Sequence, residues 1–293
     1  MELAREWITY ESPAGPVSAY LAWPAAVTDP LPAVVVMQEV WGVDGHIADV
    51  TERVASAGYV ALAPDLYSAG GGRAAALAPE RVEAVKSFLD AIPSDQWTAV
   101  LGDEQRRAQA LARLPEGEGV QVGETLGTLF GGMRDMGRYL AIVHAAIAFA
   151  RSHPACRGRE VATIGFCLGG SLSALLACEQ PPPAAAVIFY GGSPTAEQVA
   201  SIGCPVRGFY GQDDPRIVGG LRDFEAALRD AGADFELHVY PDTPHAFFND
   251  TRPSYRVEAA RDAWGRTLAF LAQQLAPLTT VPAGQAAEDA AGG

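Results

Sequence analysis

Ile164-Gly165-Phe166-Cys167-Leu168-Gly169-Gly170 joins a predicted strand at residues 161–164 to a predicted helix at residues 168–178. The strand is an apolar, β-branched run, and the helix has apolar residues at helical spacing. Cys167 is therefore expected in a sharp strand-to-helix turn, a nucleophile elbow with cysteine where serine is usual. Glycines two positions before and two after the cysteine allow strand and helix to pass closely. The turn places the thiol at a helix N-terminus, where free N–H groups favour thiolate and the Leu168 N–H can stabilise an oxyanion.

The same alternation of short apolar runs and longer periodic stretches continues on both sides of the elbow. Strands are expected at residues 34–37, 60–63, 161–164, 187–190, 206–210 and 235–240, and helices at 47–57, 133–153, 168–178, 217–231 and 255–275. Most of the strands have no polar face, which is typical of parallel strands covered on both sides. The pattern predicts an α/β fold with a mostly parallel, doubly wound sheet and helices on both faces.

Residues 69–132 interrupt this alternation. They contain Gly-Gly-Gly, an alanine-rich helix candidate at 79–91, a charged stretch at 103–113 and a glycine-rich stretch at 117–132. We expect a single domain over residues 1–280, in which this insertion is either a cap over a site or a surface excursion without a role in binding. Residues 281–293 are small, polar and acidic, and are expected to be a disordered tail.

A thiol nucleophile needs a base within hydrogen-bond reach, and the base needs an orienting group. His245 lies in a proline-bounded loop after the strand at 235–240, and Asp213 and Asp214 follow the strand at 206–210. All three come just after strands, where open α/β sheets bind ligands. Either aspartate could orient His245 or cap the following helix, so both stay candidates. The remaining histidines fall on predicted helices or strands and are weaker bases on position alone: His46, His144, His153 and His238.

Composition excludes several classes of partner. The formal charge of −14 and the pI near 4.7 disfavour nucleic acids and anionic membranes, which bind clusters of lysine and arginine. The chain has neither an apolar run long enough to span a membrane nor a basic, apolar leader at its start. Cysteine and histidine lack the spacing of metal ligands, and no cofactor motif follows a strand. We expect a small-molecule substrate, no metal or cofactor, and a monomer.

Cysteine usage indicates the compartment. The four cysteines never form Cys-x-x-Cys, and such sparse usage is typical of a reducing environment: Cys156, Cys167, Cys178 and Cys204. The sequence therefore predicts a cytoplasmic protein.

With these motifs in place, the chain resembles the dienelactone hydrolase (carboxymethylenebutenolidase) family of α/β-hydrolases. Besides the elbow, the likeness rests on four segments: Gln-Glu-Val-Trp-Gly at 38–42, Gly-Tyr-Val-Ala-Leu-Ala-Pro-Asp-Leu-Tyr at 58–67, and residues 211–217 and 245–250. It covers nearly the whole chain except the insertion and the tail. The resemblance implies an α/β-hydrolase fold and hydrolysis of an ester or lactone by a Cys-His-Asp triad.

The resemblance also implies roles for individual residues. Family members carry the catalytic acid three positions before an aliphatic residue, which selects Asp214, before Ile217, and leaves Asp213 a supporting role. It further implies that Glu39 sits beside the thiol and controls its protonation, and that the Val40 N–H is a second oxyanion donor.

The chain departs from family members that bind the dienelactone carboxylate. Their arginine four residues after the histidine is replaced here by Asn249, with Arg252 three positions further on. Arg73 and Arg134 are candidates for the family's other arginine contact. We name as candidate substrate-binding residues Trp41, Tyr67, Tyr190, Phe247 and Arg252, although aromatic residues at strand ends are often core.

Two alternatives stay open from the sequence. An esterase or thioesterase acting on another acyl substrate would keep the same triad. A redox- or ligand-sensing thiol protein without turnover would use Cys167 but would need neither an ordered histidine nor an oxyanion hole.

Overall fold

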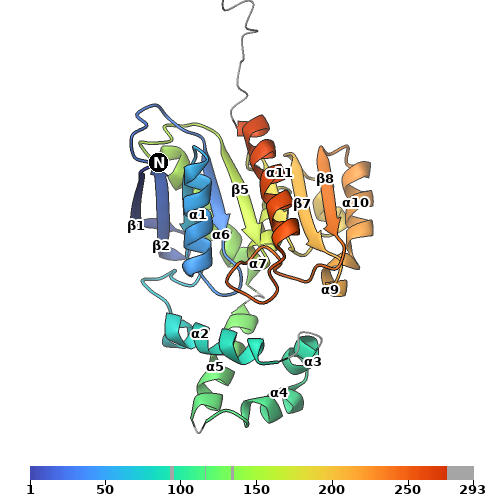
Figure 1. Cartoon of the computed structure of the whole chain (residues 1–293). Coiled ribbons are helices and arrows are strands. Elements are labelled where there is room, and N and C mark those ends of the chain that lie inside the picture. The colour runs from blue at the N-terminus through green and yellow to red at the C-terminus, as the bar shows by residue number, and fades with distance from the viewer. Residues whose placement is uncertain (93–95, 116, 133–134, 276–293) are drawn as a thin grey trace, which may run out of the picture.

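An eight-stranded sheet forms the centre of the computed structural model, which describes residues 1–92, 96–115, 117–132 and 135–275 (Figure 1). Its strands are β1 (Leu3–Ser12), β2 (Gly15–Pro24), β3 (Ala33–Met37), β4 (Val60–Pro64), β5 (Val161–Phe166), β6 (Ala186–Phe189), β7 (Val206–Gly211) and β8 (Phe235–Tyr240). Their order is β1-β2-β4-β3-β5-β6-β7-β8, and all neighbours from β4 to β8 are parallel. The predicted α/β fold with a mostly parallel sheet is confirmed.

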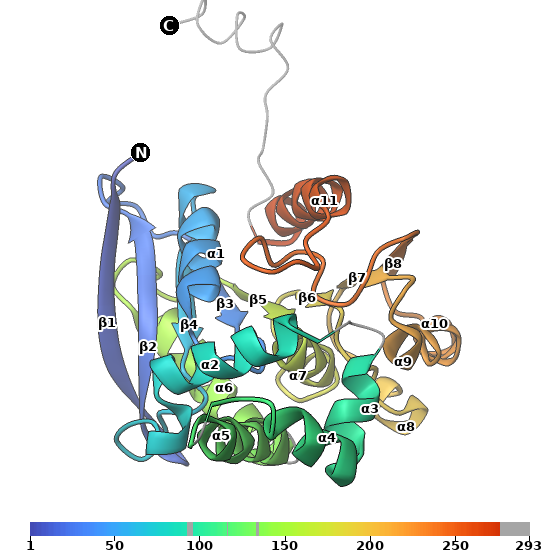
Figure 2. The same cartoon turned by 60° about the horizontal axis from the view of Figure 1, so that its bottom comes forward.

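Helices cover both faces of this sheet (Figure 2). On one face α1 (Gly45–Ser56) and α11 (Val257–Leu275) pack against a core that includes Ile164, Phe166 and Phe189. On the other face lie α6 (Met136–Ser152), α7 (Leu168–Leu176), α8 (Ala196–Val199) and α10 (Leu221–Asp230). Because strands β3 to β7 are covered twice, every residue in them is buried.

Some element bounds differ from the sequence-based expectation. The helix expected over 217–231 is two helices, α9 (Pro215–Val218) and α10, separated by Gly219 and Gly220. The strand expected over 187–190 ends at Phe189, because Tyr190 turns the chain with a φ of 42°. The hairpin of β1 and β2 was not expected; it adds two antiparallel strands beside β4. The tail at 281–293 and Arg134 lie outside the described residues.

The insertion is helical and lies beyond the ends of the parallel strands, below the sheet in Figure 1. It consists of the short η1 (Ala75–Leu77), α2 (Pro79–Asp90), α3 (Trp97–Gly102), α4 (Glu104–Leu111) and α5 (Glu118–Gly132). The glycine-rich stretch forms α5 because its small residues allow close packing: a Cβ on Gly119 would lie 2.5 Å from the carbonyl oxygen of Leu111. These helices share an apolar cluster of their own, which also takes in Val40 and Trp41 from the loop after β3.

Candidate active site

Cys167 occupies the turn between β5 and α7. Its φ of 53° and ψ of −110° lie in a region that is costly for any residue with a Cβ. The surrounding backbone holds it there: a Cβ on Gly165 would lie 1.8 Å from the carbonyl oxygen of Gly169, and one on Gly169 would lie 2.4 Å from that of Met37. The Cys167 N–H donates to the Phe189 carbonyl at 3.0 Å. The structure therefore has the sharp turn that the glycine spacing predicts.

His245 and Asp214 meet beside this turn. His245 Nδ1 lies 2.5 Å from Asp214 Oδ2, and the Asp214 side chain is buried although it heads α9 without capping it. The two loops can approach because Gly211 lacks a side chain; a Cβ there would lie 2.3 Å from the Thr243 carbonyl oxygen. Asp213 is exposed, and its N–H donates to that same carbonyl. The structure thus brings Asp214, not Asp213, to His245.

The electrostatics of His245 favour its charged form. Burial alone would lower the pKa of His245, but the Cys167 sulfur and the Asp214 carboxylate both raise it by charge and hydrogen bonding, to a net value of about 10. At neutral pH the imidazole therefore carries a proton on each nitrogen. With Nδ1 directed to Asp214, the other N–H is available to the sulfur or to a substrate oxygen.

Glu39 is held by a buried hydrogen-bond network. Its Oε1 accepts from the Tyr190 hydroxyl at 3.1 Å and its Oε2 from Asn249 Nδ2 at 2.7 Å. Burial and the charges of Glu39 and Cys167 keep the pKa of Tyr190 well above its usual range, so the phenol stays a donor. The Tyr190 ring also lies edge-on to the His245 ring, 5.1 Å between centroids. The sequence did not predict that Tyr190 and Asn249 both donate hydrogen bonds to Glu39. The three residues are far apart in the chain, so no local sequence pattern indicates the contact.

The two expected oxyanion donors lie on neighbouring segments. Gly169 N–H donates to the Gln38 carbonyl at 3.0 Å, which fixes the loop after β3 against the N-terminus of α7. The Tyr67 hydroxyl donates to the Val40 carbonyl at 2.8 Å and so orients the loop's backbone. Within the described ranges, neither the Val40 nor the Leu168 N–H donates to a protein acceptor. Both amides are therefore free to bind an oxyanion.

The remaining candidates for substrate binding have different surroundings. Phe247 is fully buried and packs on Tyr190 and Tyr240, with centroids 5.5 and 5.3 Å away, so its position is that of a core residue. Arg252 is buried beneath the insertion, where it pairs with Asp90 at 2.8 Å and lies 5.1 Å from the Trp41 ring centroid. Trp41 is likewise buried, whereas Tyr67 is half-buried.

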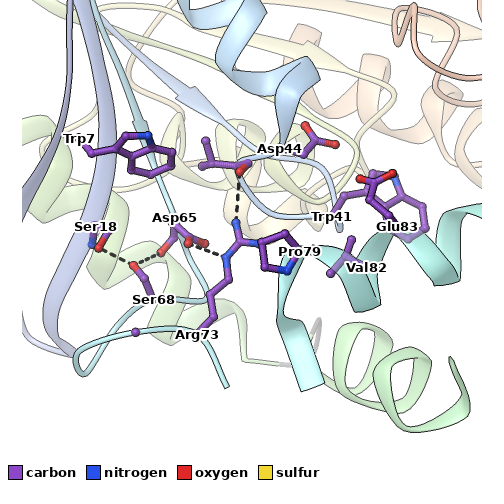
Figure 3. A pocket seen from close by; sticks show the side chains of 12 residues that line it. Trp7, Ser18, Trp41, Asp44, Asp65, Ser68, Arg73, Pro79, Val82 and Glu83 are labelled. Carbon is purple, nitrogen blue, oxygen red and sulfur yellow. Dashed lines mark hydrogen bonds and ion pairs between the residues drawn. The ribbon is translucent and has the colours of Figure 1, made fainter. Parts of the chain in front are cut away.

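Arg73 belongs to a pocket of about 320 Å³ that the proposed catalytic residues do not line (Figure 3). The pocket lies between the β1–β2 hairpin, the loops after β3 and β4, and α2, and its lining includes Trp7, Trp41 and Asp65 but neither Cys167 nor His245. Arg73 pairs with Asp65 at 2.7 Å and donates to the Val43 carbonyl at 3.3 Å. Its guanidinium thus bonds to the loops after β3 and β4.

The other cysteines differ from Cys167 in their surroundings. All four are free. Burial raises the pKa of Cys156, that of Cys178 to about 11 and that of Cys204 to about 12. These three thiols stay protonated at neutral pH. In the described part of the chain, no group of three or more histidine, cysteine or acidic residues could hold a metal ion, and no helix is long and apolar enough to cross a membrane.

Comparison with known proteins places the chain in a family. Residues 17–275 match the model of the dienelactone hydrolase family. A protein named "Putative carboxymethylenebutenolidase" from Saccharolobus solfataricus is 33% identical over 265 residues, 90% of this chain and 96% of that protein. One of the same name from Yersinia pestis is 31% identical over 285 residues, 94% of this chain and 90% of that protein.

A solved structure supports the same assignment. The crystal structure named "Putative Dienelactone Hydrolase" from Klebsiella pneumoniae is 28% identical, covers 93% of this chain and 100% of its own, and superposes with a TM-score of 0.68. The family match spans the strands that carry Cys167, Asp214 and His245. The chain therefore belongs to the dienelactone hydrolase family and is a carboxylic ester hydrolase of that type.

Proposed function

We propose that this hydrolase cleaves an ester or lactone by covalent catalysis, with Cys167 as nucleophile, His245 as acid and base, and Asp214 as the group that orients His245. The observation that carries the proposal is the 2.5 Å contact of His245 Nδ1 with Asp214 Oδ2, together with the strained turn that presents Cys167 at the start of α7. Cys167 and Asp214 both raise the pKa of His245. A sulfur paired with a protonated imidazole is an activated nucleophile.

In the first half-reaction the Cys167 thiolate attacks the carbonyl carbon. The carbonyl electrons move onto oxygen, and the N–H groups of Leu168 and Val40 stabilise that oxyanion. As the tetrahedral intermediate collapses, the bond to the leaving oxygen breaks and His245 donates its proton to that oxygen. The product is a thioester on Cys167, with His245 now neutral and still held by Asp214.

In the second half-reaction neutral His245 removes a proton from water, and the resulting hydroxide attacks the thioester carbonyl. The second intermediate collapses with cleavage of the carbon–sulfur bond, which releases the acid and restores the thiolate beside protonated His245. For a lactone, the alcohol and the acid are parts of one product. We further propose that the insertion covers this site and belongs to the same domain. We also propose that the protein acts as a monomer. Its free cysteines are consistent with a cytoplasmic location.

The proposed substrate is a neutral or weakly anionic ester rather than the dienelactone itself. Asn249 stands where dienelactone-binding relatives have arginine, and its amide is already bonded to Glu39. Arg252 is paired with Asp90, and Arg73 with Asp65. Each arginine already has a carboxylate partner, so neither brings the net positive charge that would balance a substrate carboxylate, although Nη1 of Arg252 has no hydrogen-bond partner among the described residues.

The test measures release of p-nitrophenol from a short-chain p-nitrophenyl ester beside opening of a dienelactone. Wild type is compared with Cys167→Ala, His245→Ala and, as a matched control, His153→Ala, which changes a histidine outside the site. We expect turnover of the ester by wild type and the control and its loss in the other two variants. Full activity of Cys167→Ala would refute the covalent mechanism. Faster opening of the dienelactone would refute the substrate assignment alone.

A further inference from the structure

The loop of residues 40–44, here named the oxyanion loop, lies between the proposed catalytic residues and the insertion. Its backbone begins with Val40, whose N–H is one proposed oxyanion donor. Two of its side chains face the insertion: Val40 and Trp41 are buried in the insertion's apolar cluster, which also contains Val82 and Val85 of α2. Val43, by contrast, packs in the core beneath α1. The first half of the loop thus takes its side-chain packing from the insertion.

Lys86 of α2 holds the far end of the oxyanion loop. Its side chain is 9% exposed, and its Nζ lies 2.7 Å from Asp44 Oδ2. The other oxygen of Asp44 accepts the N–H of Ile47 at 3.0 Å and caps α1. Lys86 Nζ also lies 6.0 Å from the centroid of the Trp41 ring. One buried cation on the insertion therefore contacts two residues of the loop.

Arg73, at the start of the insertion, holds the middle of the same loop. Figure 3 shows its guanidinium between Asp65 and the segment that leads to Asp44. It donates to the Val43 carbonyl, and it packs directly on Gly42, where a Cβ would lie 2.5 Å from Nη2. Gly42 has a φ of 88°, which also favours glycine. The turn of the loop is therefore shaped around this arginine.

The insertion is in turn tied to the body of the protein at the end of α2. Asp90, four residues after Lys86, pairs with Arg252, and Arg252 lies over Trp41 on the loop. Trp41 consequently contacts two cations, one from each side of the junction between insertion and body.

We propose that Lys86 is a positioning residue, through which the docked insertion holds the oxyanion loop so that the Val40 N–H meets the substrate oxyanion. The insertion is then a working part of the active site rather than only its cover. This inference rests on the proposed function. Lys86 is then expected to affect kcat, because the Val40 N–H that it positions stabilises negative charge that develops only in the transition state.

The test compares two lysine variants with a control on the same helix. Lys86→Met keeps most of the side-chain volume but removes the charge, and Lys86→Arg keeps a cation. The control is Arg81→Met: Arg81 is also on α2 and also forms an ion pair, but with Glu124 of α5, inside the insertion. Each variant is assayed for p-nitrophenyl ester hydrolysis and, separately, for alkylation of Cys167 by iodoacetamide, a displacement that develops no oxyanion.

We expect Lys86→Met to lower kcat about tenfold or more with little change in KM, since loss of an oxyanion donor outright costs about 10²–10³-fold. Alkylation of Cys167 should not slow, Lys86→Arg should recover most of kcat, and Arg81→Met should hydrolyse the ester like wild type. Asp44→Asn, which keeps an oxygen to cap α1, should reproduce the loss, and combining it with Lys86→Met should add little.

Three results would overturn the positioning role: an unchanged kcat in Lys86→Met, alkylation slowed as much as hydrolysis, or an equal loss in Arg81→Met. Failure of the proposed function has a different signature. In that case Cys167→Ala hydrolyses the ester as fast as wild type, and the role of Lys86 falls with it. If Cys167→Ala is inert and Lys86→Met is unimpaired, the positioning role alone is wrong.

Discussion

His245 Nδ1 lies 2.5 Å from the Asp214 carboxylate, although the two residues are 31 positions apart and follow different strands. A contact this short fixes the direction of the imidazole. The opposite nitrogen is left for another partner, and Cys167 lies close enough to raise the pKa of His245.

Replacement of Cys167 by serine is expected to lower the pKa of His245 from its value of about 10. The negative sulfur is one cause of the high value, and a neutral hydroxyl removes it, while burial continues to favour the uncharged ring. NMR titration of the histidine ring resonances measures the change. His153 and His238, whose pKa values are lowered by burial, serve as internal references. An unchanged His245 titration would show that the sulfur is not its partner.

Acylation is expected to persist through neutral pH and to fall as the pH passes about 10. The pKa of His245 is raised above its ordinary value of 6.5, so its proton and the associated stabilisation are fully present below pH 6.5 and are lost as the pH rises through about 10. Above that pH the leaving oxygen loses its proton donor. Single-turnover release of the alcohol from an alkyl ester, whose leaving oxygen needs a proton, checks this between pH 6 and 11. A decline centred near pH 6.5 would contradict the pairing.

Iodoacetamide at neutral pH is expected to alkylate one cysteine of the four. Cys178 and Cys204 have pKa values of about 11 and 12, and burial also raises the pKa of Cys156, so these thiols react slowly. Cys167 is half-buried at the start of α7 beside charged His245. Mass spectrometry of the intact protein should show one added group, mapped to Cys167. If iodoacetamide alkylates Cys167→Ala as fast as wild type, the reaction is not selective for Cys167.

Gly169→Ala is expected to destabilise the fold by about 3 kcal/mol or more, at or beyond the upper end of ordinary overpacking. The new Cβ would lie 2.4 Å from the Met37 carbonyl oxygen, so β3 and α7 would have to separate. Gly127→Ala on α5 is the matched control. Its position is exposed with nothing within 4 Å, and alanine there should stabilise the helix by about 0.5–1 kcal/mol. Urea unfolding of both variants measures the difference. Equal unfolding midpoints for Gly169→Ala and Gly127→Ala would refute the close approach of α7 to β3.

Much of the fold was predictable because its central strands are buried on both faces. Apolar runs such as the one ending at Ile164 mark strands that helices cover on both faces, and such runs are visible in a single sequence. The hairpin of β1 and β2 has no such signal: β1 alternates irregularly between buried and exposed residues and carries Trp7 on its exposed side. Half-covered edge strands are set by their neighbours more than by their own composition.

The candidate site shows the same division. Local sequence motifs predict Cys167 and His245 and place both at strand ends. The choice of Asp214 over Asp213 as the acid, in contrast, rested on the family resemblance alone. The structure supplies the physical reason: the Asp214 side chain turns inward to His245, and Asp213 turns outward to solvent. The bonds of Glu39 to Tyr190 and Asn249 arise from the meeting of three loops, and no sequence period encodes them.

The backbone angles of Cys167 have a consequence for how this protein can change. With φ at 53°, any side chain at this position opposes folding, so the residue proposed to do the chemistry is a poor choice for stability. Cys167→Gly should therefore resist denaturant better than Cys167→Ala, by about 1 kcal/mol, although neither has a thiol. The enzyme is then expected to gain stability at a residue where substitution abolishes its activity, so selection for thermal tolerance alone would replace the cysteine.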